Sequence, residues 1–443
     1  MIRLLANPVR LIPLLFAAAI GVGTILLMLP VSHAQGQIAP LSTAFFTSTS
    51  AVAVTGLIVV DTATYWSKFG QIVILLLFQI GGFGIMTAAT IFGLMAGRGF
   101  GLRHRMATQV ERSRLQVGDA RSVLLLVLKI TLAVEAIVAA ILVARLMLAY
   151  DYSLGPALWH GVFHSVSAFN NAGFSSYSDS VMGFQKDGFI LVPIMLAVVL
   201  TALGFPVMQD VRTNGLRWRR WTLHTKLTVA GTVVLLGVGF VAMLAKEWSN
   251  PATLGPMDVG VKVLNAAFHS VMPRTAGFNS LDVGAFEGET LLLNYVLMFI
   301  GGGSAGTAGG IKVTTFLVLV AVVLSEIGGK RDAGLFGRRF SSSLERQALT
   351  VFFTAAMLII LGSMYILAIT DLTMDAVLFE TISAFSTVGL STGITADLPP
   401  SALMVLCILM FVGRVGTITV ATALALGGTP RPYRYPEENP IVG

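Results

Sequence analysis

Four short polar segments, each containing a glycine, interrupt a strongly apolar sequence at nearly equal intervals. The glycines are separated by 117, 104 and 112 residues, and a phenylalanine precedes each by ten, ten, nine and ten positions. Such regularity indicates internal duplication and restricts the chain to a fold of four equivalent units. The segments are Ala53–Leu57, Asn170–Phe174, Arg274–Phe278 and Ser386–Leu390, and the phenylalanines are Phe46, Phe163, Phe268 and Phe379.

The composition places these units in a membrane. Of the 443 residues, 55% are hydrophobic and 12% are charged, and the mean hydropathy is +0.83. Because soluble domains contain about a quarter of charged residues, we expect an integral membrane protein. The only cysteine, Cys407, excludes an intrachain disulfide and a cysteine metal cluster. The net charge of +7 is concentrated in short loops, which indicates membrane topology rather than nucleic-acid binding.

The N-terminal segment allows two interpretations. Arg3 and Arg10, the apolar run 11–29 and the small residues near Ala34 resemble a secretory signal peptide. The run is longer than an ordinary signal core, however, and the first unit requires it as its first helix. We therefore expect a spanning helix there.

Each unit consists of an apolar span, a short amphipathic segment, a polar glycine loop and a second apolar span. Since about 20 helical residues cross the hydrocarbon core, the short segment must re-enter from one side. We predict an all-α integral membrane fold of four helix, pore-helix, filter-loop, helix repeats around a pseudo-four-fold central pore, with eight spans. The first spans are predicted at 11–29, 123–149, 226–246 and 348–370, the pore helices at 39–50, 156–168, 258–271 and 374–385, and the second spans at 69–96, 188–208, 290–325 and 401–426. The repeats thus cover 1–96, 123–208, 226–325 and 348–426, and a short cytoplasmic C-terminal tail occupies 427–443.

The basic residues predict the orientation. The loop 97–122 contains six arginines, and 209–226 and 326–347 each contain five Lys or Arg residues. Cationic loops remain in the cytoplasm. We therefore expect a multi-pass protein of the cell membrane with both termini cytoplasmic and the four glycine loops facing outward.

Glycine suits the narrowest part of an ion pore. A dehydrated cation needs several oxygens at once, and backbone carbonyls supply them without a fixed charge. Glycine adopts positive φ and leaves room at the axis, so four such loops form a ring of oxygens. The alternative is that each glycine only closes a loop after a helix. We predict a neighbouring ring formed by Thr55, Ala172, Thr275 and Val388. The complete set of residues predicted to bind the ion is Val54, Thr55, Gly56, Asn171, Ala172, Gly173, Thr275, Ala276, Gly277, Thr387, Val388 and Gly389.

The loop motifs resemble those of the Ktr/Trk/HKT superfamily of potassium transporters, and of its Ktr branch in particular. The resemblance covers nearly the whole chain and rests on Thr47–Leu57, Ser167–Phe174, Arg274–Asn279 and Ser383–Ser391. A filter glycine in every repeat implies potassium selectivity, because a serine stands in the first repeat of sodium-carrying plant members. Gly56 therefore favours potassium. The Trk branch typically has additional N-terminal helices before the first repeat. Because this sequence begins directly at the first repeat, the resemblance leads us to expect a chain of the Ktr type.

The resemblance also implies partners. Ktr-type chains form homodimers that sit on a cytoplasmic ring of nucleotide-binding KtrA-type subunits. ATP or ADP is then expected on that regulatory partner, and no cofactor is expected in this chain apart from potassium as the transported ion. Whether sodium is required is left open. The tail 427–443 is a candidate contact with the ring or within the dimer.

The third inner span contains a glycine-rich interruption. A continuous helix over 290–325 would measure about 50 Å, too long for a straight embedded span. Six of the ten residues from 301 to 310 are glycine, which disfavours helix. A phosphate-binding loop and a small-residue helix interface are alternatives. The resemblance implies an intramembrane gating loop: Gly301, Gly302, Gly303, Ser304, Ala305, Gly306, Thr307, Ala308, Gly309 and Gly310.

Two cations are predicted at membrane depth. Lys312 follows the glycine-rich segment, and Arg414 lies within the last inner span. Charges at this depth face protein or water. The resemblance implies that Arg414 lies near the gate and hinders ion passage. The structural alternative is that both side chains donate hydrogen bonds to loop carbonyls.

Other polar residues give weaker signals. His160 and His164 have the spacing of two metal ligands on a helix, but no third ligand accompanies them. Arg274 is expected to brace its loop against Glu380 or Asp282. No partner is evident for Glu135.

Together these features predict passive or weakly coupled potassium influx without covalent chemistry. A secondary carrier would normally contain two larger repeats. A membrane-embedded enzyme would require a cluster of acid-base or metal-binding groups in the spans, which the sequence lacks. Sodium and ammonium transport are the nearer alternatives.

Overall fold

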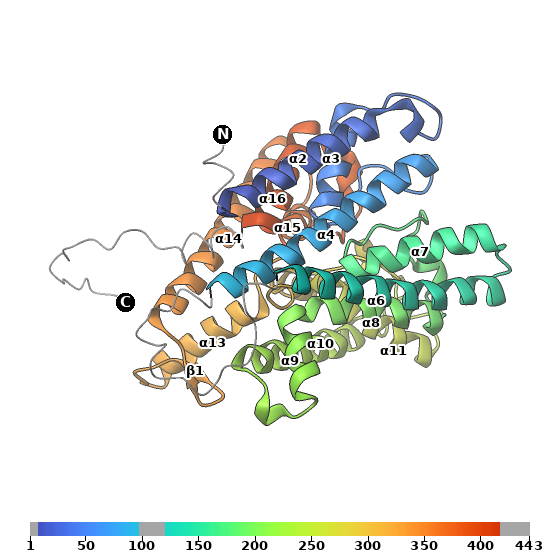
Figure 1. Ribbon diagram of the computed structural model, residues 1–443. Coiled ribbons are helices and arrows are strands. Elements are labelled where there is room, and N and C mark those ends of the chain that lie inside the picture. Colours follow the sequence, from blue (N-terminus) through green and yellow to red (C-terminus); the bar gives the residue numbers. More distant parts are fainter. Residues whose placement is uncertain (1–7, 97–119, 417–443) are drawn as a thin grey trace.

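The computed structural model describes residues 8–96 and 120–416, and in them the same order of helices occurs four times (Figure 1). The first repeat contains α2 (Pro8–Met28), α3 (Leu41–Val52) and α4 (Lys68–Ala96). The second contains α6 (Ala120–Ala149), α7 (Leu154–Asn170), α8 (Gly188–Leu203) and α9 (Phe205–Asn214). The third contains α10 (Leu223–Glu247), α11 (Val259–Val271), α12 (Gly288–Phe299) and α13 (Val313–Ile327). The fourth contains α14 (Ser342–Ile369), α15 (Met374–Phe385), α16 (Pro400–Phe411) and a π-helical turn, Val412–Gly416.

Short elements connect these helices. A small antiparallel hairpin, β1 (Gly334–Leu335) with β2 (Arg338–Arg339), lies between α13 and α14. The 3₁₀ turns are Pro30–Ser32, Met182–Phe184, Trp218–Arg220, Met272–Arg274, Val283–Ala285 and Ile394–Asp397. Most of the first basic loop, the end of the fourth repeat (417–426) and the tail 427–443 lie outside the described residues.

Helix length and composition support a multi-pass membrane fold. Among the described residues, α4, α6, α10 and α14 are each long and apolar enough to cross a membrane, and α8 with α9 adds a fifth span if the bent pair counts as one. The remaining predicted spans correspond to shorter apolar helices, namely α2, α16 and the broken pair α12 and α13.

Many apolar side chains face outward, and many polar side chains are buried. On α14, Phe353, Ile360 and Met364 are more than half exposed. On α3, by contrast, Ser48 and Ser50 are completely buried. An apolar exterior around a polar interior is the distribution that a lipid environment requires.

The four repeats close into a ring. The inner helix of each repeat packs against the short pore helix of the next: α4 contacts α7, α8 contacts α11, and α12 contacts α15. The circle is completed by α16 against α3, so the last repeat lies beside the first (Figure 1). This arrangement confirms the predicted fold class of four helical units around a central axis.

The second inner span differs from the prediction. We expected one continuous span over 188–208, but α8 and α9 meet at Gly204 with a bend of 91°. Gly204 has a φ of 87°, and a Cβ there would overlap the carbonyl oxygen of Ser304. The helix breaks because the glycine-rich segment of the third repeat occupies the space beside Gly204.

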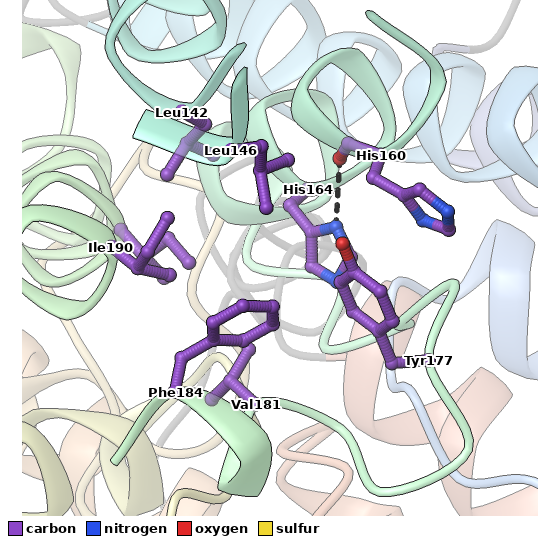
Figure 2. A pocket seen from close by; sticks show the side chains of 9 residues that line it. Leu142, Leu146, His160, His164, Tyr177, Val181, Phe184 and Ile190 are labelled. Carbon is purple, nitrogen blue, oxygen red and sulfur yellow. Dashed lines mark hydrogen bonds between the residues drawn. The ribbon is translucent and has the colours of Figure 1, made fainter. Parts of the chain in front are cut away.

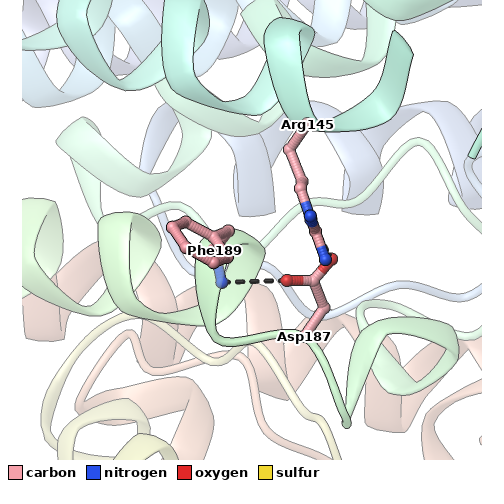
Figure 3. Close-up of polar contacts among 3 residues, drawn as sticks. All are labelled: Arg145, Asp187 and Phe189. Carbon is pink, nitrogen blue, oxygen red and sulfur yellow. Dashed lines mark hydrogen bonds and ion pairs between the residues drawn. The ribbon is translucent and has the colours of Figure 1, made fainter. Parts of the chain in front are cut away.

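An ion pair joins two helices of the second repeat at the start of α8 (Figure 3). The Nε of Arg145 lies 2.7 Å from a carboxylate oxygen of Asp187, and the guanidinium stacks over the ring of Phe189. Asp187 also caps α8, because its other oxygen accepts a hydrogen bond of 2.9 Å from the N–H of Phe189. The Asp187 carboxylate therefore links α8 to α6 and also caps the N-terminus of α8.

We predict that Asp187→Ala lowers the stability of the protein by about 1–2 kcal/mol, because the variant loses both the helix cap and the ion pair. Asp187→Asn retains a capping oxygen and should lose less than half as much. Thermal unfolding in detergent measures both variants. Equal losses would contradict a capping role.

Candidate functional site

The four predicted glycines form a closed ring of backbone contacts. Each has a left-handed φ, of 91° at Gly56, 68° at Gly173, 65° at Gly277 and 93° at Gly389. A Cβ on any of them would overlap a carbonyl oxygen of the next loop, so only glycine fits without displacing backbone. The overlapped oxygens belong, in the same order, to Ala172, Ala276, Val388 and Thr55.

These contacts correct one detail of the sequence analysis. The neighbouring ring was predicted to include Thr275, but the third carbonyl at this level is that of Ala276. The other three members, Thr55, Ala172 and Val388, stand directly before their glycines as expected.

The loop geometry of the first, second and fourth repeats depends on a serine six residues before the glycine. The N–H groups of Thr55 and Ala172 donate to the carbonyls of Ser50 and Ser167 over 2.8 Å, and that of Val388 donates to Ser383 over 2.9 Å. The serine hydroxyls also bond to backbone groups of their own loops, Gly56 N–H, the Phe174 carbonyl and Gly389 N–H. This role was not predicted from the sequence, although the recurrence of a serine at the same position in three repeats indicates it.

The third loop is built differently. Val271 replaces the serine, and the turn Met272–Arg274 follows α11 directly. Val54, Asn171 and Thr387 adopt positive φ, whereas Thr275 has an extended backbone with φ of −175°. The N–H groups of Ala276 and Gly277 share the carbonyl of Met272. This shorter path explains why the phenylalanine in this repeat precedes the glycine by nine residues and not ten.

The glycine-rich segment 301–310 packs directly against the ring. The amide of Asn171 donates to the hydroxyl of Thr307 over 2.8 Å. A Cβ on Gly309 would overlap the carbonyl of Ser386 and the hydroxyl of Thr387. Three glycine loops therefore contact this segment, because Arg274 of the third loop also donates to the carbonyl of Gly301 over 3.0 Å.

Both cations predicted at membrane depth contact the same segment. Arg414, which is 3% exposed, donates to the carbonyl of Thr307 from the π-helical turn. Lys312 donates to the carbonyl of Ala308. These bonds agree with the structural role considered for each residue, in which loop carbonyls solvate the charge of the buried Arg414 and of the partly buried Lys312.

The broken helix of the second repeat supports the opposite side of the segment. The N–H of Gly303 donates to the carbonyl of Ala202 over 2.7 Å, and the N–H of Phe205 donates to the carbonyl of Ala305 over 3.3 Å. The two ends of the segment pair with each other through a bridge between Ile300 and Ile311. Helix termini and side-chain donors thus satisfy backbone that no lipid could solvate.

The expected partner of Arg274 was wrong. Its guanidinium bonds to a loop carbonyl, and Glu380 instead accepts hydrogen bonds from Ser391 and Thr395. Arg274 is nevertheless buried beside the ring, at 3% exposure.

The two histidines of α7 have other partners than a metal. His160 bonds to Ser176 over 2.6 Å and His164 bonds to Ser175 over 2.9 Å. Across residues 8–96 and 120–416, the structure contains no group of three His, Cys, Asp or Glu side chains suited to a metal ion.

A family model for cation transport proteins, TrkH, matches residues 16–427. The chain belongs to the TrkH family of cation transport proteins. It is 38% identical to the Ktr system potassium uptake protein B of Bacillus subtilis over 440 residues, which cover 99% of this chain and 97% of that protein. It is 35% identical to the protein of the same name from Vibrio alginolyticus, with coverages of 98% and 94%. Members of this family are transporters and not enzymes.

Two further similarities agree with this assignment. The chain is 33% identical to the potassium/sodium uptake protein NtpJ of Enterococcus hirae, across 100% of this chain and 98% of that protein. Its fold matches the crystal structure of the potassium transporter TrkH from Vibrio parahaemolyticus with a TM-score of 0.74 at 20% identity, over 96% of this chain and 85% of the other.

We predict that Gly277→Ala destabilises the protein by more than Gly36→Ala. Both glycines have similar left-handed φ, 65° and 70°, so both variants incur about 1–2 kcal/mol of backbone strain. Only at Gly277 does a Cβ overlap a carbonyl, whereas Gly36 faces open space. Thermal unfolding of the two variants in detergent isolates the effect of ring closure. Equal unfolding midpoints would contradict the tight ring.

Proposed function

We propose that this chain mediates potassium uptake through a channel-like pore whose selectivity filter is the ring of four glycine loops. The ions bind to the backbone carbonyls at Val54–Gly56, Asn171–Gly173, Thr275–Gly277 and Thr387–Gly389. The observation that carries this proposal is the cyclic packing, in which each glycine touches a carbonyl of the next loop. Four loops arranged in this way can surround one ion with oxygens from all repeats.

Unpartnered hydroxyl groups beside the ring support the proposal. Within the described part of the chain, the hydroxyls of Thr55, Thr275 and Thr387 are buried without a hydrogen-bond partner. Such groups require water or a cation to compensate for their burial. A path along the axis that is filled with water or cations supplies such partners to the three hydroxyls.

The glycine-rich segment 301–310 is proposed as the gate of this pore. Its contacts with Asn171 and Thr387 support a position across the inner side of the filter. The bonds from Arg414 and Lys312 support a role of these residues in holding it there. Arg414 acts twice: it bonds to the loop and repels cations. Passage then requires the loop to leave the axis.

The assembly and orientation are proposed from the relatives and from the charges. Relatives that are named as parts of a Ktr system suggest a multi-component transporter. We infer a homodimer on a cytoplasmic KtrA-type ring that binds ATP or ADP, with both termini in the cytoplasm. The name of the relative NtpJ includes sodium, so sodium is a candidate activating or co-transported ion.

Ion flux into liposomes tests the function directly. Purified protein should transport potassium and rubidium faster than sodium and ammonium. A preference for sodium or ammonium in the unmodified protein would refute the substrate assignment. Because the regulatory ring could be needed, the assay includes a KtrA-type partner with ATP or ADP.

We predict that Gly56→Ser relaxes discrimination against sodium by about tenfold or more. A side chain at Gly56 would displace the carbonyl of Ala172 and so distort the oxygen ring. The measurement is the ratio of rubidium to sodium flux in liposomes. Gly36→Ser serves as the control, because Gly36 has a similar left-handed φ but open space around its Cα. An unchanged ratio in Gly56→Ser would contradict the filter assignment.

We predict that deletion of residues 301–310 raises potassium flux several-fold while the order of ion preference stays the same. The chain can be joined directly from Ile300 to Ile311 in this variant, because these two flanking residues already lie side by side in a β-bridge. Thr307→Val, which removes the hydroxyl bonded to Asn171, should raise flux to a smaller extent, and Thr307→Ser should not. Flux that does not change in the deletion variant would refute the gate.

A further inference from the structure

The residue directly after the aligned phenylalanine is ionisable in three pore helices, α7, α11 and α15. In α11 this residue, His269, bonds to Asn294. In α7 and α15 it connects to the loop beyond the filter glycine. His164 of α7 and Glu380 of α15 each stand nine residues before the glycine of their loop. Both are buried, at 3% and 0% exposure. In the part of the chain that the structure describes, the hydrogen bonds of both side chains go to groups other than the ring carbonyls.

Both side chains bind a serine that lies two residues beyond the filter glycine. The Nε2 atom of His164 is 2.9 Å from the hydroxyl of Ser175. A carboxylate oxygen of Glu380 accepts a hydrogen bond of 2.9 Å from the hydroxyl of Ser391. Thr395 donates a further bond to the same oxygen.

The second and fourth repeats also share a hydrogen bond between this serine and the backbone that follows it. The hydroxyl of Ser175 accepts a hydrogen bond of 3.0 Å from the N–H of Tyr177. The hydroxyl of Ser391 accepts one of 2.9 Å from the N–H of Gly393. In both repeats, therefore, the pore helix is tied through one serine to the turn that leaves the filter.

The histidine is itself held in place (Figure 2). Its Nδ1 atom lies 2.8 Å from the carbonyl oxygen of His160, and its ring stacks on Tyr177 with centroids 5.1 Å apart. Leu142, Leu146 and Ile190 are among the apolar residues around it (Figure 2). This packing leaves the imidazole one orientation, which directs Nε2 to Ser175.

The first and third repeats lack this connection. The residues two positions beyond their glycines are Ile58 and Asn279, which have no hydroxyl. Because the repeats contact one another in the order first, second, third, fourth and back to first, the second and fourth lie opposite each other across the ring.

We propose that His164 and Glu380 are positioning residues of the selectivity filter, and that the bonds to Ser175 and Ser391 form two opposed clamps. Each clamp fixes the outer side of a loop whose inner side is already held where the N–H of Ala172 or Val388 donates to the carbonyl of Ser167 or Ser383. The Ala172 and Val388 carbonyls between the two anchors then keep the spacing that suits potassium. This inference rests on the proposed function, since it assigns a role within the same filter.

The test compares Ser391→Ala with Ser391→Thr in the full-length protein in liposomes, with Ser175→Ala as the equivalent change in the second repeat. The alanine variants remove the hydroxyl that each clamp requires, whereas threonine retains it. We expect the rubidium-to-sodium flux ratio to fall about threefold to tenfold in each alanine variant, the scale of one hydrogen bond, and to stay at the unmodified value in Ser391→Thr.

Glu380→Gln and Glu380→Ala provide a second comparison. The amide of glutamine retains an acceptor oxygen for Ser391 and Thr395, so Glu380→Gln should keep more of the selectivity than Glu380→Ala. Thermal unfolding is measured in parallel. A lower unfolding midpoint with an unchanged flux ratio in Ser391→Ala would mean that the clamp only stabilises the fold, and this result would overturn the proposal. Absence of selectivity in the unmodified protein would instead refute the proposed function.

Discussion

The structure depends on one constraint: every backbone group that leaves a helix inside the apolar part of the molecule needs a partner other than lipid. The four glycine loops and the segment 301–310 create many such groups. The chain satisfies them with serine hydroxyls in three loops, with the end of a broken helix at Ala202, and with the cationic side chains Arg274 and Arg414. Because Ala202 and Arg414 belong to the second and fourth repeats, the segment 301–310 of the third repeat gains these partners only when the ring of repeats is closed.

This constraint also explains why buried cations accompany the glycine-rich segment. The segment has little side-chain volume, so it cannot pack its own carbonyls away. Arg414 and Lys312 reach the carbonyls of Thr307 and Ala308, and Arg274 reaches that of Gly301. A charged donor forms a stronger hydrogen bond than a neutral one, which suits a loop without a helix to hold it. The loop can move only if these donors find other acceptors or water.

Much of the fold follows from the sequence, because hydropathy, helix length and the fourfold glycine spacing are strong local signals. The break at 301–310 was also predictable from its six glycines. The bend at Gly204 was not, since one glycine in an apolar run is compatible with a straight helix, and the cause is the segment around Ser304, a hundred residues further along the chain. The partner of Arg274 was missed for the same reason: a nearby acid is visible in the sequence, but a loop carbonyl that lacks a partner is not.

The third repeat illustrates how duplicated units diverge without opening the ring. It has lost the serine anchor, since Val271 stands in that position, and its loop reaches the axis by a path one residue shorter. Its glycine nevertheless meets the carbonyl of Val388 as the other glycines meet theirs. The position that adopts left-handed backbone elsewhere is extended here, and Arg274 beside it binds the segment 301–310. Ring closure fixes only where the glycine and its preceding carbonyl lie, so the supporting contacts behind them are free to differ between repeats.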